Sequence, residues 1–201
     1  MTSTGRPSEG FDFGADSLAA FLERVASDEP APGGGAAAAV SAALAAGLVA
    51  MTARLSSRHL DEPETVMAEA DRLRAEALRL ATQDAEAYGD VLAAYRLGKD
   101  AAGRSARIKL ALERATEVPL AIARVGAALA SLASLMSTQG NPNLRGDAFV
   151  AVVLADAATT GAARLVELNV RLGGLDRQWV DEARDHVAAS ADAVELAGPP
   201  S

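Results

Sequence analysis

The chain has 201 residues, half of them hydrophobic and 3% aromatic, with no cysteine and a formal net charge of -8. The absence of cysteine excludes disulfides, thiolate metal sites and cysteine nucleophiles. The negative charge argues against non-specific binding to nucleic acid or to an anionic membrane. Most of the hydrophobic residues are alanine, the best helix former, whereas sheets favour β-branched and aromatic residues. The composition therefore predicts an all-α protein.

The N-terminal segment, residues 1–15, is rich in Gly, Ser, Thr and Pro and is predicted to form a flexible tail. A single helical domain is predicted over residues 16–197. Leu18, Phe21 and Val25 recur at helical spacing and predict a short first helix, with Asp16 as its N-cap.

A glycine turn opens the second predicted helix, in which Pro32-Gly33-Gly34-Gly35 precedes an alanine-rich run to about Leu55. Such a turn leaves unpaired backbone N–H groups that can face a ligand. The nearly uncharged segment 36–53 has the length of a membrane span. Its alanine content and lack of aromatic flanks favour a buried helix in a cytoplasmic protein. Residues at helical spacing are predicted to face the core: Gly34, Ala37, Ser41, Leu44, Leu48, Met51 and Leu55.

A third, long helix is predicted from Asp61-Glu62-Pro63-Glu64, with Asp61 as its cap, to about Leu97. One carboxylate, Asp84, lies within its apolar seam. A buried ionised carboxylate is costly unless it is paired or hydrogen-bonded, so Asp84 has either a partner cation or a function. The other seam positions are Val66, Ala70, Leu73, Ala77, Leu80, Ala87, Val91 and Ala94.

A fourth helix is predicted from residues 102–105 to about Ser137, and Pro119 is expected to kink or split it. The segment Gly140-Asn141-Pro142-Asn143 then marks a break, with Gly140 ending one helix and Asn143 capping the next.

The fifth predicted helix has Asp147 at the head of its apolar stripe and ends at Gly173-Gly174, and a last helix runs from about Asp176 to Val194. Together these patterns predict a bundle of five or six long helices.

Two carboxylates that point inward from different helices, Asp84 and Asp147, predict a polar site beside the glycine turn, where they could face each other across a groove. Nearby cations are candidates for the same site: Lys99, Arg104, Arg145 and Arg171. The turn is not a nucleotide loop, because no Gly-Lys-Ser/Thr follows it. The structural alternative is a helical bundle in which the aspartates form salt bridges between helices.

In their order along the chain, these landmarks resemble the cyclodeaminase domain of formiminotransferase-cyclodeaminase and its stand-alone relatives, including bacterial methenyltetrahydrofolate cyclohydrolases. The resemblance covers roughly residues 18–194. Besides the PGGG turn it includes Asp84-x-Glu86-Ala87-Tyr88, Leu97-Gly98-Lys99, Ala115-Thr116-Glu117-Val118-Pro119-Leu120, Gly140-Asn141-Pro142-Asn143, Asp147-Ala148 and Leu168-Asn169-Val170.

The resemblance implies an all-α homodimer that acts on a tetrahydrofolate one-carbon adduct without a metal or redox cofactor. It implies three catalytic residues. Asp147 is the expected general acid/base, Asp84 stabilises the cationic substrate or handles a second proton, and Lys99 holds a substrate oxygen or the glutamate tail. One folate groove is expected to include the substrate-binding residues Gly33, Gly34, Gly35, Asn141, Asn143, Arg145 and Asn169.

The favoured activity is hydrolysis of 5,10-methenyltetrahydrofolate, in which water adds to the amidinium carbon and the ring opens to 10-formyltetrahydrofolate. A first alternative is the cyclodeaminase reaction, in which N10 attacks a formimino carbon and ammonia leaves. A second is a folate-binding relative without catalysis. Gly146 and Phe149 suggest it, because the family often has Ser and Gly at these positions.

Overall fold

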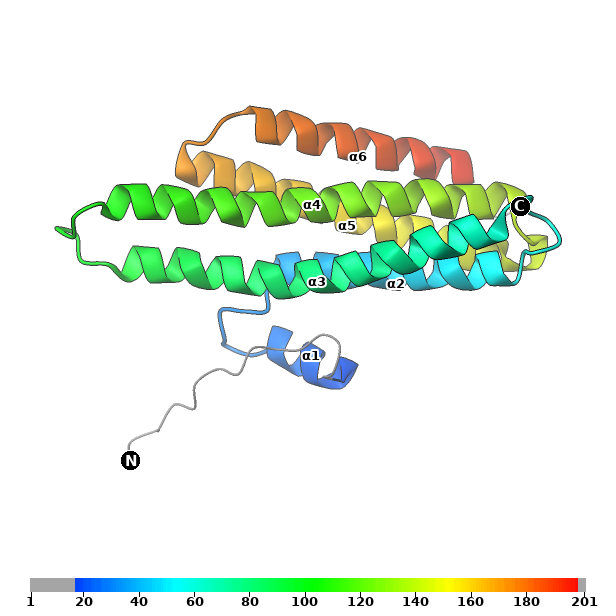
Figure 1. The fold of residues 1–201 in the computed structure, drawn as a ribbon, viewed down its shortest axis with the longest axis horizontal. Coiled ribbons are helices and arrows are strands. Elements are labelled where there is room, and N and C mark those ends of the chain that lie inside the picture. The colour runs from blue at the N-terminus through cyan, green and yellow to red at the C-terminus, as the bar shows by residue number, and fades with distance from the viewer. Residues whose placement is uncertain (1–16, 199–201) are drawn as a thin grey trace.

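The structure, a computed structural model, describes residues 17–198, which form α-helices, one 3₁₀ turn and no strand (Figure 1). The all-α prediction is confirmed, and the predicted tail over residues 1–15 lies outside the described residues. The elements are α1 (Leu18–Val25), α2 (Gly34–Arg54), α3 (Pro63–Arg96), α4 (Arg104–Gln139), η1 (Pro142–Leu144), α5 (Arg145–Gly173) and α6 (Gln178–Ala197).

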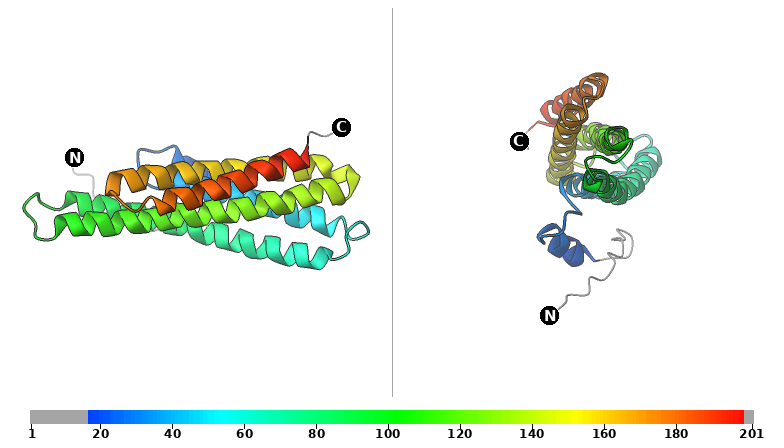
Figure 2. Two further views of the ribbon diagram at one scale, coloured as in Figure 1. Left: turned by 90° about the horizontal axis from the view of Figure 1, so that it is seen from above. Right: turned by 90° about the vertical axis from the view of Figure 1, so that its left-hand side faces the viewer.

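The bundle is built on the antiparallel pair α3 and α4, the two longest helices (Figure 1). The helix α2 packs against α3, α4 and α5, whereas α5 packs against α4 and α2, and α6 covers α4 and α5. The short α1 lies outside the bundle (Figure 2), with Phe21 reaching the core. Because α2 is much shorter than α3, it covers only part of that helix, and α3 and α4 continue beyond its start (Figure 1).

The helix boundaries agree with most of the predicted signals. Pro63 is the first residue of α3, but Glu62 rather than the predicted Asp61 precedes it as N-cap. Gly140 ends α4, which runs unbroken through Pro119, so the predicted split does not occur. Asn141, and not Asn143, supplies the capping side chain of the next turn, because its Oδ1 accepts a bond of 3.0 Å from the Asn143 N–H.

The predicted seam of α3 is confirmed, since each of its apolar members is buried between α3 and the rest of the bundle. The spacing of apolar residues in α3 identifies its buried face because charged residues occupy the other faces. A single continuous apolar stripe remains.

The predicted core face of α2 is wrong. Leu44 is 52% exposed, and Leu55 is exposed too. The residues of α2 that enter the core are smaller: Gly35, Ala36, Ala39, Ala42, Ala43, Ala45, Ala46, Val49, Ala50 and Ala53. In a helix that is apolar on every side, periodicity does not identify the buried face. The neighbouring helices approach most closely where the side chains are small, which leaves the leucines outside.

Close helix contact also explains a buried glycine of α4. A Cβ at Gly126 would overlap Oγ1 of Thr159 on α5. That hydroxyl donates to the Ala155 carbonyl at 2.8 Å, so its polar group is satisfied inside the bundle. The α4–α5 contact therefore depends on a position without a side chain.

Three segments of the described chain are long and apolar enough to cross a membrane, judged by length and composition alone: Gly34–Arg54, Arg104–Gln139 and Pro142–Gly173. The most apolar window of each is 56%, 67% and 44% buried, respectively, inside the bundle, which accounts for much of their apolar character.

Candidate functional site

The carboxylate of Asp84 lies at the start of α2. Its Oδ2 accepts a hydrogen bond of 3.0 Å from the Ala36 N–H, one of the first amides of that helix. Burial raises the pKa of Asp84 above its ordinary value, and the bond from Ala36 opposes part of this shift. Asp84 belongs to no ion pair with a described residue, so the salt-bridge alternative does not account for it.

Gly35 supplies the space in which this carboxylate sits. A Cβ at Gly35 would overlap the Asp84 carboxyl group, whereas a Cβ at Gly34 would meet nothing within 4 Å. Only a residue without a side chain at position 35 therefore allows Asp84 to reach the amide of Ala36. The contact with Asp84 therefore requires glycine at position 35 but places no such requirement on position 34.

Beside Asp84 a cavity of about 420 Å³ opens in the space that α2 does not fill, between α3, α4 and α5. The predicted residues Gly33, Gly34, Gly35 and Asn169 line it, together with Asp84. Its remaining lining is mostly apolar and comes from these helices and from the loop before α2: Pro30, Ala31, Tyr88, Val91, Tyr95, Leu112, Ala115, Pro119, Leu165, Leu168 and Leu172.

Both tyrosines of the chain line this cavity, and sequence reasoning did not include either among the site residues. Tyr88 and Tyr95 are each 44% exposed and follow Asp84 by four and eleven residues, which puts all three on one face of α3. Two aromatic rings beside an apolar cavity can hold a flat heterocyclic ligand by stacking. The signal that could have identified them is their helical spacing from the seam carboxylate.

Asn169 is fixed by the proline of α4. Pro119 has no N–H, so the carbonyl of Ala115 loses its usual helical donor. The Nδ2 of Asn169 donates to that carbonyl at 2.5 Å. Asn169, which the resemblance assigns to substrate binding, is thus held in place by its hydrogen bond to the Ala115 carbonyl, which has no helical donor within α4.

The other predicted site residues lie at the opposite end of α2. Asn141 donates from its backbone to Oγ of Ser56 at 2.8 Å and from its side chain to the Leu55 carbonyl at 3.3 Å. Leu55 follows Ala36 by nineteen residues, a separation of roughly 28 Å along a helix. The expectation of one groove within a single chain is therefore wrong.

Asp147 lies with Asn143 and Arg145 near that second end, and it is exposed rather than turned inward. It takes part in no ion pair among the described residues. It occupies the first turn of α5, where the helix dipole favours a negative charge. Phe149 packs against the core at this end, so its bulk does not enter the Asp84 cavity.

Lys99 lies in the exposed connection between α3 and α4, beyond the end of α3 at Arg96. It follows Asp84 by fifteen residues and is roughly 20 Å from it along the helix axis. Lys99 is therefore outside the lining of the Asp84 cavity, and the structure does not bring these two predicted catalytic residues together.

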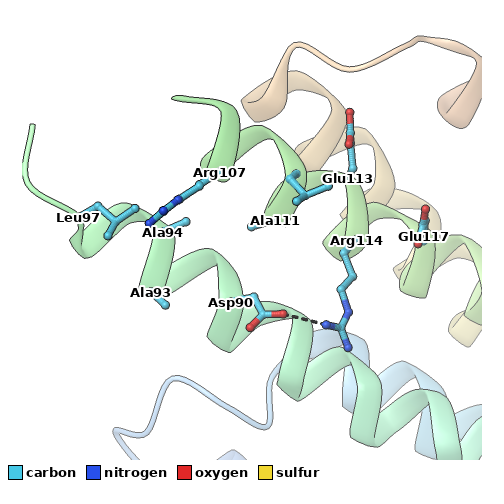
Figure 3. A pocket seen from close by; sticks show the side chains of 10 residues that line it. Asp90, Ala93, Ala94, Leu97, Arg107, Ala111, Glu113, Arg114 and Glu117 are labelled. Atoms are coloured by element: carbon cyan, nitrogen blue, oxygen red, sulfur yellow. Dashed lines mark hydrogen bonds and ion pairs between the residues drawn. The ribbon is translucent and has the colours of Figure 1, made fainter. Parts of the chain in front are cut away.

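A larger groove of about 610 Å³ lies between α3 and α4 (Figure 3). It shares no lining residue with the Asp84 cavity. Its charged residues are exposed except for Glu113, which is half-buried, and Arg114 is bound to Asp90 at 3.0 Å and to Glu86 at 3.6 Å. No buried titratable group faces this groove, so the smaller cavity at Asp84 is the candidate active site. Within residues 17–198, no three His, Asp or Glu side chains are grouped so as to hold a metal ion.

The fold and the site define the protein as an all-α bundle with a carboxylate held at the start of a glycine-opened helix. Comparison with known proteins identifies its family. The sequence model of the formiminotransferase-cyclodeaminase family matches residues 17–189. The chain therefore belongs to this family, and the resemblance inferred from the PGGG turn and the stretches after it is confirmed.

Two characterised relatives are enzymes. The chain is 36% identical over 181 residues to a methenyltetrahydrofolate cyclohydrolase of Methylorubrum extorquens, covering 85% of this chain and 86% of that protein. It is 30% identical over 164 residues to the formimidoyltransferase-cyclodeaminase of Sus scrofa, covering 77% of this chain but only 30% of the longer pig protein.

The fold also matches a solved structure. The crystal structure of formiminotetrahydrofolate cyclodeaminase from Thermotoga maritima superimposes with a TM-score of 0.83 at 26% sequence identity. The match covers 92% of this chain and 94% of the Thermotoga chain.

The first prediction concerns Gly35. Gly35→Ala should drive the Asp84 carboxylate off the Ala36 amide, whereas Gly34→Ala adds the same helix propensity in open space. We expect the free energy of unfolding of the Gly35 variant to be about 1–3 kcal/mol below that of the Gly34 variant. Urea unfolding of both proteins measures the difference. Equal stabilities would show that the contact does not constrain position 35.

The second prediction concerns Asn169 and Pro119. Asn169→Ala leaves the Ala115 carbonyl without its side-chain donor and should cost about 1–3 kcal/mol of stability. In a Pro119→Ala background residue 119 regains an N–H for that carbonyl, so the same substitution should cost much less. A double-mutant cycle measured by denaturant unfolding gives the coupling energy. Additive effects would contradict the assignment.

Proposed function

We propose that this protein hydrolyses 5,10-methenyltetrahydrofolate to 10-formyltetrahydrofolate. The observation that carries the proposal is Asp84, a partly buried carboxylate at a cavity wall with no cationic partner in the described chain. Such a group is stabilised by a ligand that brings its own positive charge. The amidinium that bridges N5 and N10 of the substrate is such a charge, and the identity to the Methylorubrum cyclohydrolase supports this choice of substrate.

The cavity suits the rest of the substrate as well. Tyr88 and Tyr95 provide aromatic faces for the fused ring, and Leu165 and Leu172 provide apolar contacts on the opposite helix. Unpaired amide N–H groups at the glycine turn can donate to a ring carbonyl, either directly or through water.

The chemistry is proton transfer around one carbon. As the water oxygen bonds to the amidinium carbon, Asp84 accepts a proton from that water, and a neutral hydroxylated adduct forms. Asp84 then returns the proton to N5 while the carbon–N5 bond breaks. The hydroxyl proton leaves to solvent or to a second carboxylate, and the formyl group remains on N10. Burial moves the pKa of Asp84 upward, in the direction of neutral pH. A group whose pKa lies nearer to the working pH can both accept and donate a proton. We assign no metal or redox cofactor to this reaction.

The formiminotetrahydrofolate cyclodeaminase reaction is the second candidate, supported by the match to the Thermotoga structure. The same carboxylate would stabilise the amidinium product that forms as ammonia leaves. Ammonia release from formiminotetrahydrofolate, measured beside loss of the methenyl absorbance band, separates the two activities. Binding of folate without either reaction identifies a non-catalytic relative.

We further propose that the protein is a homodimer formed through the outer faces of α2 and α5. α2 carries no charged residue before Arg54. Its outer residue Leu44 is exposed, as are Val150 and Val153 on the adjacent α5. A continuous uncharged surface of this kind suits a second copy of the chain better than water.

The dimer would also resolve the separation between the two predicted halves of the site. Leu44 is the central residue of α2, so a twofold axis there places the start of one α2 beside the end of the other. Asn141 is bound to the end of α2. The pairing therefore brings Asn141 and Asp147 of the partner subunit to the Asp84 cavity, where the partner's Asp147 can accept the second proton.

The third prediction tests Asp84 directly. Asp84→Asn should lower turnover of methenyltetrahydrofolate by at least about a hundredfold, measured by loss of its near-ultraviolet absorbance. The variant should be more stable than the wild type at pH 7, because burial raises the folded pKa and ionisation therefore costs folding free energy. This gain should shrink as the pH falls through the folded pKa and should vanish below the ordinary pKa of an aspartate, where the wild-type group is protonated in both states. Wild-type turnover in the variant would refute the assignment.

The fourth prediction tests the shared site. Asp84→Asn and Asp147→Asn should each be nearly inactive alone. After the subunits of the two variants are exchanged, half of the dimers are mixed and each mixed dimer has one intact site. Activity should therefore return to about one quarter of the wild-type value. No recovery in mixtures shown to contain mixed dimers would place each site within one chain.

The proposed face has a matched control. Leu44→Arg should dissociate the dimer and lower activity, as measured by light scattering and turnover. Leu110→Arg should change neither, because Leu110 is 67% exposed in the groove between α3 and α4. A Leu44 variant that remains dimeric would exclude this face.

A further inference from the structure

The end of α3 is bound by the first residue of the next helix. Arg104 of α4 donates from Nε to the Leu97 carbonyl at 3.1 Å and from Nη2 to the Tyr95 carbonyl at 3.2 Å. Because α3 ends at Arg96, it supplies no helical N–H to either carbonyl. One guanidinium group therefore satisfies two carbonyls at this helix end, where the helix dipole also favours a positive charge.

The connection over residues 97–103 brings Arg104 back to α3. Within it the Ala101 N–H donates to the Gly98 carbonyl at 2.9 Å, and the Arg104 N–H donates to the Ala101 carbonyl at 3.1 Å. Gly103 has a φ of 73°, in the left-handed region that favours glycine. The turn is thus defined by its own backbone, and it leaves the Arg104 side chain half-buried against the end of α3.

The same end of α3 lines the candidate active site. Tyr95 belongs to the last turn of α3 and lines the Asp84 cavity. Its side chain is exposed, so packing within the bundle constrains it less than it constrains a core residue. Terminal turns of a helix open easily when their carbonyls lack partners. Arg104, a candidate cation from the sequence, lines no part of this cavity, so its effect on the cavity is transmitted by Tyr95.

We propose that Arg104 is a positioning residue for substrate binding, which holds the last turn of α3 closed and thereby holds the Tyr95 ring against the bound substrate. The inference rests on the proposed function, which places the rings of the substrate beside the tyrosines of the cavity. Tyr95 follows Asp84 by eleven residues, roughly 16 Å along the helix axis, and is therefore distant from the reacting carbon. Arg104 should thus affect the binding of substrate and not the chemical step.

A double-mutant cycle on the hydrolysis of methenyltetrahydrofolate tests the proposal. Arg104→Gln should raise KM roughly five- to tenfold and change kcat by less than about twofold. Tyr95→Ala should raise KM by at least as much. Adding Arg104→Gln to Tyr95→Ala should then have little further effect on KM, because the ring that Arg104 holds in place is already absent.

Hydrogen–deuterium exchange measures the positioning without substrate. In Arg104→Gln the amides of residues 93–97 should exchange about tenfold faster than in the wild type. Protection in the rest of the chain shows that the variant is folded. The control variant Arg79→Gln removes the same charge from an exposed residue of α3 that lines no part of the Asp84 cavity, so it should change neither KM nor this exchange.

The outcomes are distinct. An equal rise in KM from Arg104→Gln in the wild-type and Tyr95→Ala backgrounds would overturn the positioning role and leave the proposed function intact. A fall in kcat at unchanged KM, or unchanged exchange over residues 93–97, would have the same consequence. A wild type that neither hydrolyses nor binds methenyltetrahydrofolate would overturn the proposed function, and the positioning role with it.

Discussion

The hydrogen bond between the Ala36 amide and the Asp84 carboxylate is the contact on which the site depends. It requires an unpaired N–H at the start of α2, a carboxylate in the seam of α3, and a position without a side chain at Gly35. These three requirements come from segments forty-eight residues apart and meet at one point. Because the bond offsets only part of the burial cost, Asp84 remains easier to protonate than an exposed aspartate.

The limited length of α2 determines where this contact occurs. The helix starts beside the middle of α3, and beyond that point α3, α4 and α5 enclose a cavity instead of a fourth helix (Figure 1). The first amides of α2 therefore face a ligand-sized space rather than packed side chains. Pro119 and Asn169 belong to the same region, where the proline removes a helical bond and the asparagine replaces it. Apart from the glycine turn, the residues that line the cavity are thus polar at Asp84 and Asn169 and apolar or aromatic elsewhere.

Much of this arrangement was predictable from the sequence. The α3 seam, with Asp84 inside it, follows from spacing because the other faces of α3 carry charges. The buried face of α2 was not predictable in this way, since almost all of its residues are apolar and only the close approach of neighbouring helices selects a face. The order of motifs along the chain also contained no information about their distance in space. The predicted length of α2 did give this distance, because nineteen helical residues imply a separation of roughly 28 Å between its two ends.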